Sequence, residues 1–138
     1  MSSTVIIMLF AIVLVLGGAI LLAIVTRGQK QLDKEKYRSK WMQVEGSLKK
    51  DNESSQHLAV LNADKLLDAA LKDANYKGQT MGERLKSATP SLSNANAVWA
   101  SHKLRNRIAH ETDVKVDYNT VRRALAGFKQ GLKDLGAI

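Results

Sequence analysis

Two kinds of apolar pattern divide this sequence. From Val5 to Val25 every residue is uncharged, whereas from Arg27 onward apolar residues recur at helical spacing between polar ones. About 20 apolar residues, at a rise of 1.5 Å each, cross the hydrocarbon layer of a membrane. The pattern predicts a transmembrane anchor over residues 1–26 and one all-helical domain behind it.

The first helix behind the anchor carries four apolar residues at helical spacing: Tyr37, Trp41, Val44 and Leu48. Because the segment around them is rich in Lys and Arg, we interpret residues 27–50 as a basic juxtamembrane helix or stalk. The polar run that follows separates this stalk from a bundle domain over residues 51–138. The next helix is expected over about residues 55–75, with Ser54 or Ser55 capping its start.

Three further helices are expected in the bundle domain. Thr80 and Glu83 form a capping box that opens a short helix, and Pro90 prevents that helix from continuing. A longer helix is expected over residues 94–110, and an amphipathic last helix starts near Asp117. No strand-like alternation of useful length occurs in the sequence. The predicted fold class is therefore all-α, with a single N-terminal transmembrane helix followed by a small antiparallel helical bundle.

Positive charge gathers at both ends of the segment behind the anchor. Residues 27–50 carry 8 basic and 3 acidic residues, and residues 98–138 carry 8 and 4. Lys and Arg concentrate on the cytoplasmic side of membrane spans, and all of them lie behind this span. We therefore predict a single-pass protein of the plasma (inner) membrane, with its N-terminus outside and its domain in the cytoplasm. The absence of cysteine agrees with a reducing compartment and excludes thiol chemistry.

The densest run of reactive side chains covers residues 102–111 and holds two of the three histidines. Asn106 and His110 are four residues apart and share a helix face, so the amide can orient the imidazole. Arg105 lies about 140° from His110 around an ideal helix and converges with it only through its own length or a frayed helix end. These residues also have structural uses, since the helix dipole stabilises a protonated His110 and a neighbouring carboxylate pairs with Arg105.

The spacing Arg105-Asn106-x-x-x-His110, near the end of the third helix of a small bundle, resembles the R-x4-6-H motif of the HEPN superfamily. The resemblance covers roughly residues 55–138 in helix order. It implies metal-independent RNA cleavage at a dimer interface, in which a 2′-hydroxyl attacks its own phosphate. It also implies that His110 acts as general base or acid, that Arg105 steadies the phosphorane charge, and that Asn106 holds the imidazole. This chemistry needs no metal and no other cofactor.

The cations near the motif and in the last helix suit an RNA partner, because Lys and Arg neutralise phosphates. The expected RNA-binding residues are Lys103, Arg107, His102, Arg122 and Arg123. Two interpretations stay open. In the first, a membrane-tethered, HEPN-like homodimer binds RNA and cleaves it. In the second, the chain is a non-catalytic, membrane-anchored interaction or dimerisation module with a protein partner. Sequence motifs of metal hydrolases, phosphate loops and serine nucleophiles are missing.

Overall fold

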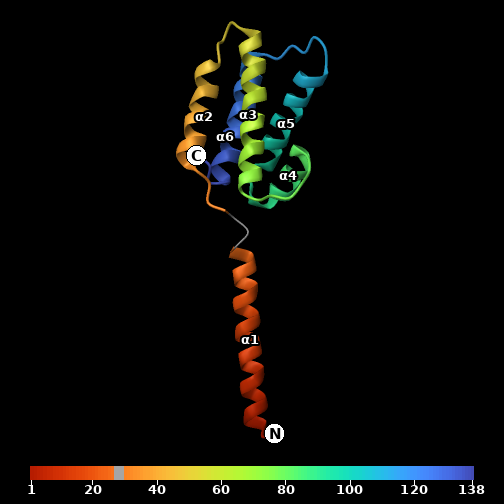
Figure 1. The fold of residues 1–138 in the computed structure, drawn as a ribbon. Coiled ribbons are helices and arrows are strands. Elements are labelled where there is room, and N and C mark those ends of the chain that lie inside the picture. The colour runs from red at the N-terminus through yellow and green to blue at the C-terminus, as the bar shows by residue number, and fades with distance from the viewer. Residues whose placement is uncertain (27–29) are drawn as a thin grey trace. The chain divides into compact units, whose positions relative to one another are not determined.

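The computed structural model describes residues 1–26 and 30–138, and these residues form helices without any strand (Figure 1). The helices follow one another as α1 (Ser3–Thr26), α2 (Lys34–Ser47), α3 (Glu53–Asp73), α4 (Met81–Ala88), the 3-10 helix η1 (Thr89–Ser91), α5 (Ala95–His110) and α6 (Tyr118–Asp134). They form two compact units, Met1–Lys30 and Gln31–Ile138. The predicted all-α class is confirmed.

The first unit consists of the apolar helix α1. Its large apolar side chains are exposed along the helix, as Phe10 at 67% and Val15 at 71% illustrate. A soluble helix keeps a polar face for the solvent, and α1 has none. By length and composition α1 is able to span a membrane, as its sequence predicts.

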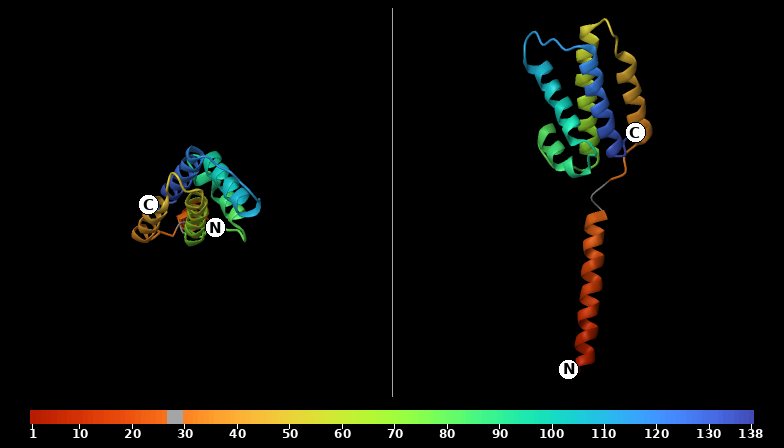
Figure 2. Two further views of the ribbon diagram at one scale, coloured as in Figure 1. Left: turned by 90° about the horizontal axis from the view of Figure 1, so that it is seen from above. Right: turned by 180° about the vertical axis from the view of Figure 1, so that it is seen from behind.

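The second unit is a bundle in which α3 lies between α2 and α5, with α6 packed behind it (Figures 1 and 2). Helix α3 contacts α2, α4, α5 and α6, and α5 also contacts α6. Fully buried side chains from four helices meet in the core: Tyr37, Val60, Leu67, Leu71, Val98, Val121, Phe128 and Leu132. The helical spacing of these apolar residues is the basis on which the antiparallel bundle was predicted, and the bundle is confirmed.

Helix α2 is part of this bundle. Tyr37, Trp41 and Val44 are buried in the same core as α3 and α6, and the Tyr37 hydroxyl donates a hydrogen bond to Asp73 on α3. Burial and the Asp73 carboxylate raise the pKa of Tyr37 well above its ordinary value, so the hydroxyl stays a donor. The compact unit begins at Gln31, whereas the sequence places residues 27–50 in a separate stalk. Of that predicted stalk, residues 27–29 lie outside the described residues.

Side-chain caps start the helices of the bundle. Asn52 caps α3 by accepting a hydrogen bond from the Ser55 amide at 2.9 Å, so the predicted Ser54 or Ser55 cap is wrong by two or three residues. Ser55 instead bonds backward to the carbonyl groups of Lys49 and Asn52. Helices α4, α5 and α6 start near the predicted positions, and the side chains of Thr80, Asn94 and Asp117 cap them.

Helices α5 and α6 pack closely at Gly127. A methyl group at this position would lie 2.5 Å from Ser101 Oγ and 2.9 Å from the Ala97 carbonyl oxygen. Because neither distance is compatible with a carbon atom, only glycine allows the two helices to approach this far. This close packing sets the floor of a groove between α5 and α6, which Ala97 and Ser101 line.

Candidate nucleic-acid interface

Helix α5 presents the predicted site residues on two different sides. His102, Arg105 and Asn106 belong to a polar network that joins α5 to α3. Lys103 and Arg107 are exposed and line a groove between α5 and α6. The two sides follow from the helical period, because residues two apart, such as Arg105 and Arg107, point about 160° away from each other.

The network on the α3 side has Asp64 at its centre. Asp64 Oδ1 lies 2.7 Å from His102 Nδ1, which donates to the carboxylate, and Asp64 Oδ2 lies 3.3 Å from Arg105 Nε. Arg105 Nη1 donates to Asn106 Oδ1 at 3.0 Å, and the Asn106 amide lies 3.4 Å from His102 Nε2. With the ring proton on Nδ1, Nε2 accepts from Asn106, and a chain of hydrogen bonds runs from Arg105 through Asn106 and His102 to Asp64.

Burial differs among the members of this network. The side chains of Asp64 and His102 are 4% and 9% exposed, whereas that of Arg105 is 34% exposed. Arg105 Nε is itself buried and makes no hydrogen bond of acceptable geometry to any described residue. The carboxylate therefore holds the imidazole firmly and the guanidinium only by charge.

A second aspartate–arginine pair, one turn further along α3, is built more tightly. Asp68 accepts two hydrogen bonds from Arg84 of α4, at 2.7 and 3.1 Å, and Arg84 also donates to the Gly78 carbonyl at 2.8 Å. Burial raises the pKa of Asp68, but the bonds from Arg84 outweigh it, so the pKa lies below its ordinary value. Arg84 is 7% exposed, and the pair clamps α4 onto α3.

The α5/α6 groove has a different character. Its volume is about 570 Å³, and its lining residues are Ala97, Ala100, Ser101, Lys103, Leu104, Arg107, Thr120, Arg123 and Ala124. Among these lining residues, three are cations and none is acidic. Arg107 pairs with Glu111 at 3.7 Å, but both side chains are more than half exposed, so water and salt screen this contact.

The outer side of α5 extends the groove wall from Lys103 and Arg107 to His110. Lys103, Arg107 and His110 follow one another at positions i, i+4 and i+7 and are all exposed, which places them on one ridge of the helix. We call Lys103, Arg107, His110 and Arg123 the basic ridge. Arg123 joins it from α6, and its Nη2 donates to Thr120 Oγ1 at 3.0 Å.

The structure thus separates the predicted catalytic residues. The side chains of Arg105 and Asn106 bond to each other, whereas the side chain of His110, the exposed last residue of α5, makes no hydrogen bond or ion pair with either of them among the described residues. His102, expected at the RNA surface, is buried against Asp64. Arg122, expected there too, lies on the α2 side of α6 beside Trp41 and Lys129.

Asp64 is the member of the site that the sequence interpretation missed. It follows Val60 by four residues and precedes Leu67 by three, on the face of α3 that is buried. An acidic residue on a buried helix face needs a cationic or hydrogen-bonding partner. The position of Asp64 on the apolar face of α3 could therefore have indicated a partner on a neighbouring helix.

No known protein family, curated protein or solved structure matches this chain. Among the described residues, no group of three His, Asp or Glu side chains is arranged to hold a metal ion.

Proposed function

We propose that this chain is a single-pass membrane protein whose helical domain lies in the cytoplasm and binds RNA. The observation that carries the proposal is the α5/α6 groove, where Lys103, Arg107 and Arg123 surround an apolar floor and no described lining residue is acidic. Water and salt screen the contact between Arg107 and the exposed Glu111, so the three cations keep their attraction for phosphate, and each contact made releases counterions from the nucleic acid. An apolar floor between such cations suits the face of a base.

The membrane part of the proposal rests on α1 and on the distribution of charge. Helix α1 has the length and composition of a span. Every Lys and Arg follows α1 in the sequence, which supports an N-terminus outside and a domain in the cytoplasm of the plasma (inner) membrane.

RNA cleavage is a second proposal, and it rests on the HEPN-like spacing of Arg105, Asn106 and His110. In this chemistry a 2′-oxygen attacks the adjacent phosphorus and the bond to the 5′-oxygen breaks, while one group removes the 2′ proton and another protonates the leaving oxygen. His110 is exposed and free of steric cover, which suits proton exchange with RNA. No hydrogen bond joins Arg105 to His110 among the described residues, and in this proposal a homodimer interface brings both groups to the RNA.

A non-catalytic interaction or dimerisation module is the competing proposal. The observation in its favour is that Asp64 and Asn106 already engage the Arg105 guanidinium. In this case the bundle binds a protein partner through an apolar surface, and the binding is largely insensitive to salt.

The test uses the full chain in nanodiscs of neutral phosphatidylcholine and a fluorescent 12-nucleotide RNA. Replacing the three groove cations by glutamine lowers the RNA affinity by about 100-fold at low salt, since each phosphate contact contributes about 1 kcal/mol. The control variant removes three exposed lysines outside the groove and keeps the wild-type affinity. The test variant is Lys103→Gln, Arg107→Gln, Arg123→Gln, and the control is Lys65→Gln, Lys77→Gln, Lys86→Gln.

If the two variants bind RNA equally, the groove is not the binding site. Cleavage is scored in the same samples with EDTA present. Loss of cyclic phosphate ends in both Arg105→Ala and His110→Ala supports the nuclease, and intact RNA with the unaltered chain leaves only binding.

A further inference from the structure

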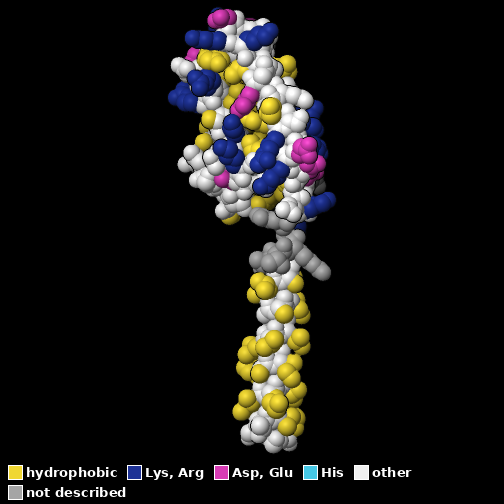
Figure 3. All heavy atoms as spheres, turned by 90° about the vertical axis from the view of Figure 1, so that its left-hand side faces the viewer, with side chains coloured by type: hydrophobic (Ala, Val, Ile, Leu, Met, Phe, Trp, Pro, Cys, Tyr) yellow, Lys and Arg dark blue, Asp and Glu magenta, His cyan; other side chains and the backbone are white. Residues whose placement is uncertain are grey.

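A second basic surface lies on the other side of α6, where α6 faces α2. Figure 3 shows Lys and Arg side chains spread over this side of the bundle, with apolar side chains between them. We define the α2/α6 face by its five cations: Lys34, Arg38, Arg122, Lys129 and Lys133. It differs from the basic ridge in its residues: Arg122 lines the α2/α6 side of α6 and Arg123 lines the α5/α6 groove, since neighbouring residues of a helix point about 100° apart. The two side chains also line a shallow hollow together, beside Asp117.

The five cations outnumber the carboxylates beside them. Glu35 lines a hollow with Lys34 and Arg38, and Asp117 lines one with Arg122. Glu45 is the acidic residue at the centre of the face, and it accepts hydrogen bonds from Lys129 at 3.0 Å and from Trp41 at 2.7 Å. The Lys129 bond lowers the pKa of Glu45, so it stays ionised and neutralises one cation. The only acidic residue within α6 is Asp134, whose carboxylate is bonded to Ser93 at the end of the helix.

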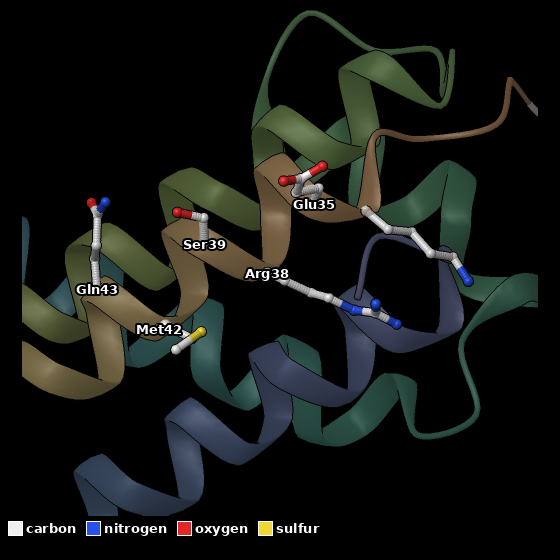
Figure 4. Close-up of a pocket in the computed structure, with 6 residues that line it drawn as sticks. Glu35, Arg38, Ser39, Met42 and Gln43 are labelled. Atoms are coloured by element: carbon white, nitrogen blue, oxygen red, sulfur yellow. The ribbon is translucent and has the colours of Figure 1, made fainter.

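The face also carries an exposed apolar side chain. Lys34, Arg38 and Met42 are spaced four residues apart, and Met42 is 70% exposed. In Figure 4, Arg38 and Met42 project from one side of α2, while Ser39 and Gln43 project from the other. Cations together with a flexible apolar side chain are typical of surfaces that lie on lipid headgroups.

We propose that the α2/α6 face docks on anionic lipid headgroups of the membrane that holds α1. The proposal rests on the membrane part of the proposed function but not on RNA binding. Helix α2 begins eight residues after α1 ends, and eight residues reach at most about 28 Å. A domain on so short a connection stays close to the lipid surface, where anionic headgroups attract each Lys or Arg within a Debye length.

The experiment measures how lipid protects this face in the full chain. Because the sequence contains no cysteine, a single introduced thiol reports on one position. Ala126 is exposed on α6 and lines the α2/α6 face, whereas Ala109 is exposed on α5. Ala126→Cys is the test variant and Ala109→Cys the matched control. Each variant is reconstituted in nanodiscs of phosphatidylcholine, with or without about 30% phosphatidylserine. The thiol is then labelled with a membrane-impermeant maleimide.

We expect phosphatidylserine to slow labelling at Ala126→Cys by about tenfold, as a docked face with several cations implies, and to leave Ala109→Cys unchanged. Adding Arg122→Gln and Lys133→Gln restores fast labelling, whereas adding Lys77→Gln and Lys86→Gln does not. Equal labelling of Ala126→Cys in both lipids overturns the proposal.

Equal slowing at both cysteines also overturns it, because protection would then not be confined to the face. In neutral nanodiscs an RNA oligonucleotide that slows labelling at Ala126→Cys would show that the face binds RNA instead of lipid. If the chain binds RNA but phosphatidylserine does not slow labelling, only the lipid-docking inference is refuted. If phosphatidylserine slows labelling but the chain does not bind RNA, only the RNA proposal is refuted.

Discussion

Asp64 of α3 accepts a hydrogen bond from His102 of α5 at 2.7 Å, with both side chains nearly buried. The same carboxylate faces Arg105 Nε at 3.3 Å through its second oxygen. One buried acidic residue thus holds two side chains of the run that the sequence marks as chemically dense. The network turns His102 and Arg105 toward α3, although polar residue types alone would suggest a position at the surface.

We expect Asp64→Ala to lower the free energy of unfolding by about 2–4 kcal/mol, since a buried imidazole loses its acceptor and a partly buried guanidinium loses an opposite charge. Urea unfolding followed by circular dichroism measures this change. Asp51→Ala is the control, because Asp51 is exposed in the loop before α3. A change of less than about 0.5 kcal/mol for Asp64→Ala would mean that the network contributes no net stability.

Gly127 and Gly46 offer a matched test of helix packing. Gly127→Ala places a methyl group 2.5 Å from Ser101 Oγ, whereas Gly46→Ala meets no atom within 4 Å. We expect Gly127→Ala to destabilise the domain by about 1–3 kcal/mol and Gly46→Ala to stabilise it by about 0.5 kcal/mol. Thermal unfolding of the two variants checks both signs. Equal effects would contradict the close packing of α5 against α6.

The stability of the domain depends on pH in the acid range. Bonds from Lys129 lower the pKa of Glu45, and bonds from Arg84 lower that of Asp68 against the effect of burial. A carboxyl group with a lowered folded-state pKa stabilises the fold above its ordinary pKa, and this stability is lost as the pH falls through the folded value. We therefore expect the urea midpoint to be lower at pH 3 than at pH 6.5.

Glu45→Gln should reduce this difference, because glutamine does not titrate. A midpoint that is the same at both pH values in the wild-type chain would show that neither ion pair contributes to stability. The measurement is a urea titration of each chain followed by circular dichroism.

The sequence predicted the helices well because their apolar residues follow the helical period. The buried residues Tyr37, Trp41 and Val44 are the positions expected from the spacing, and the last helix begins at Tyr118, next to the start expected near Asp117. Composition was less informative about α2, since its Lys and Arg residues suggested a stalk. Tyr37 and Trp41 instead pack it into the core, because burial of two large aromatic side chains outweighs the solvation of the opposite face.

The candidate site could be predicted only in part. Lys103, Arg107 and Arg123 meet at one groove, but neither the groove nor the partner of His102 follows from a local pattern. Asp64 is 38 residues away from His102 in the sequence. Which side chains meet across α3 and α5 depends on the rotation of each helix in the bundle, and one sequence does not encode that rotation in a local motif.

The salt dependence of RNA binding by the full chain, in neutral nanodiscs, tests the proposed function most directly. Three phosphate contacts by the groove cations predict that the logarithm of the affinity falls with the logarithm of salt concentration, with a slope of about −2. Removing Arg107 by Arg107→Gln should reduce the slope by about 0.7. Absence of RNA binding at low salt, or binding with a slope near zero, would contradict the proposal and favour the protein-interaction module.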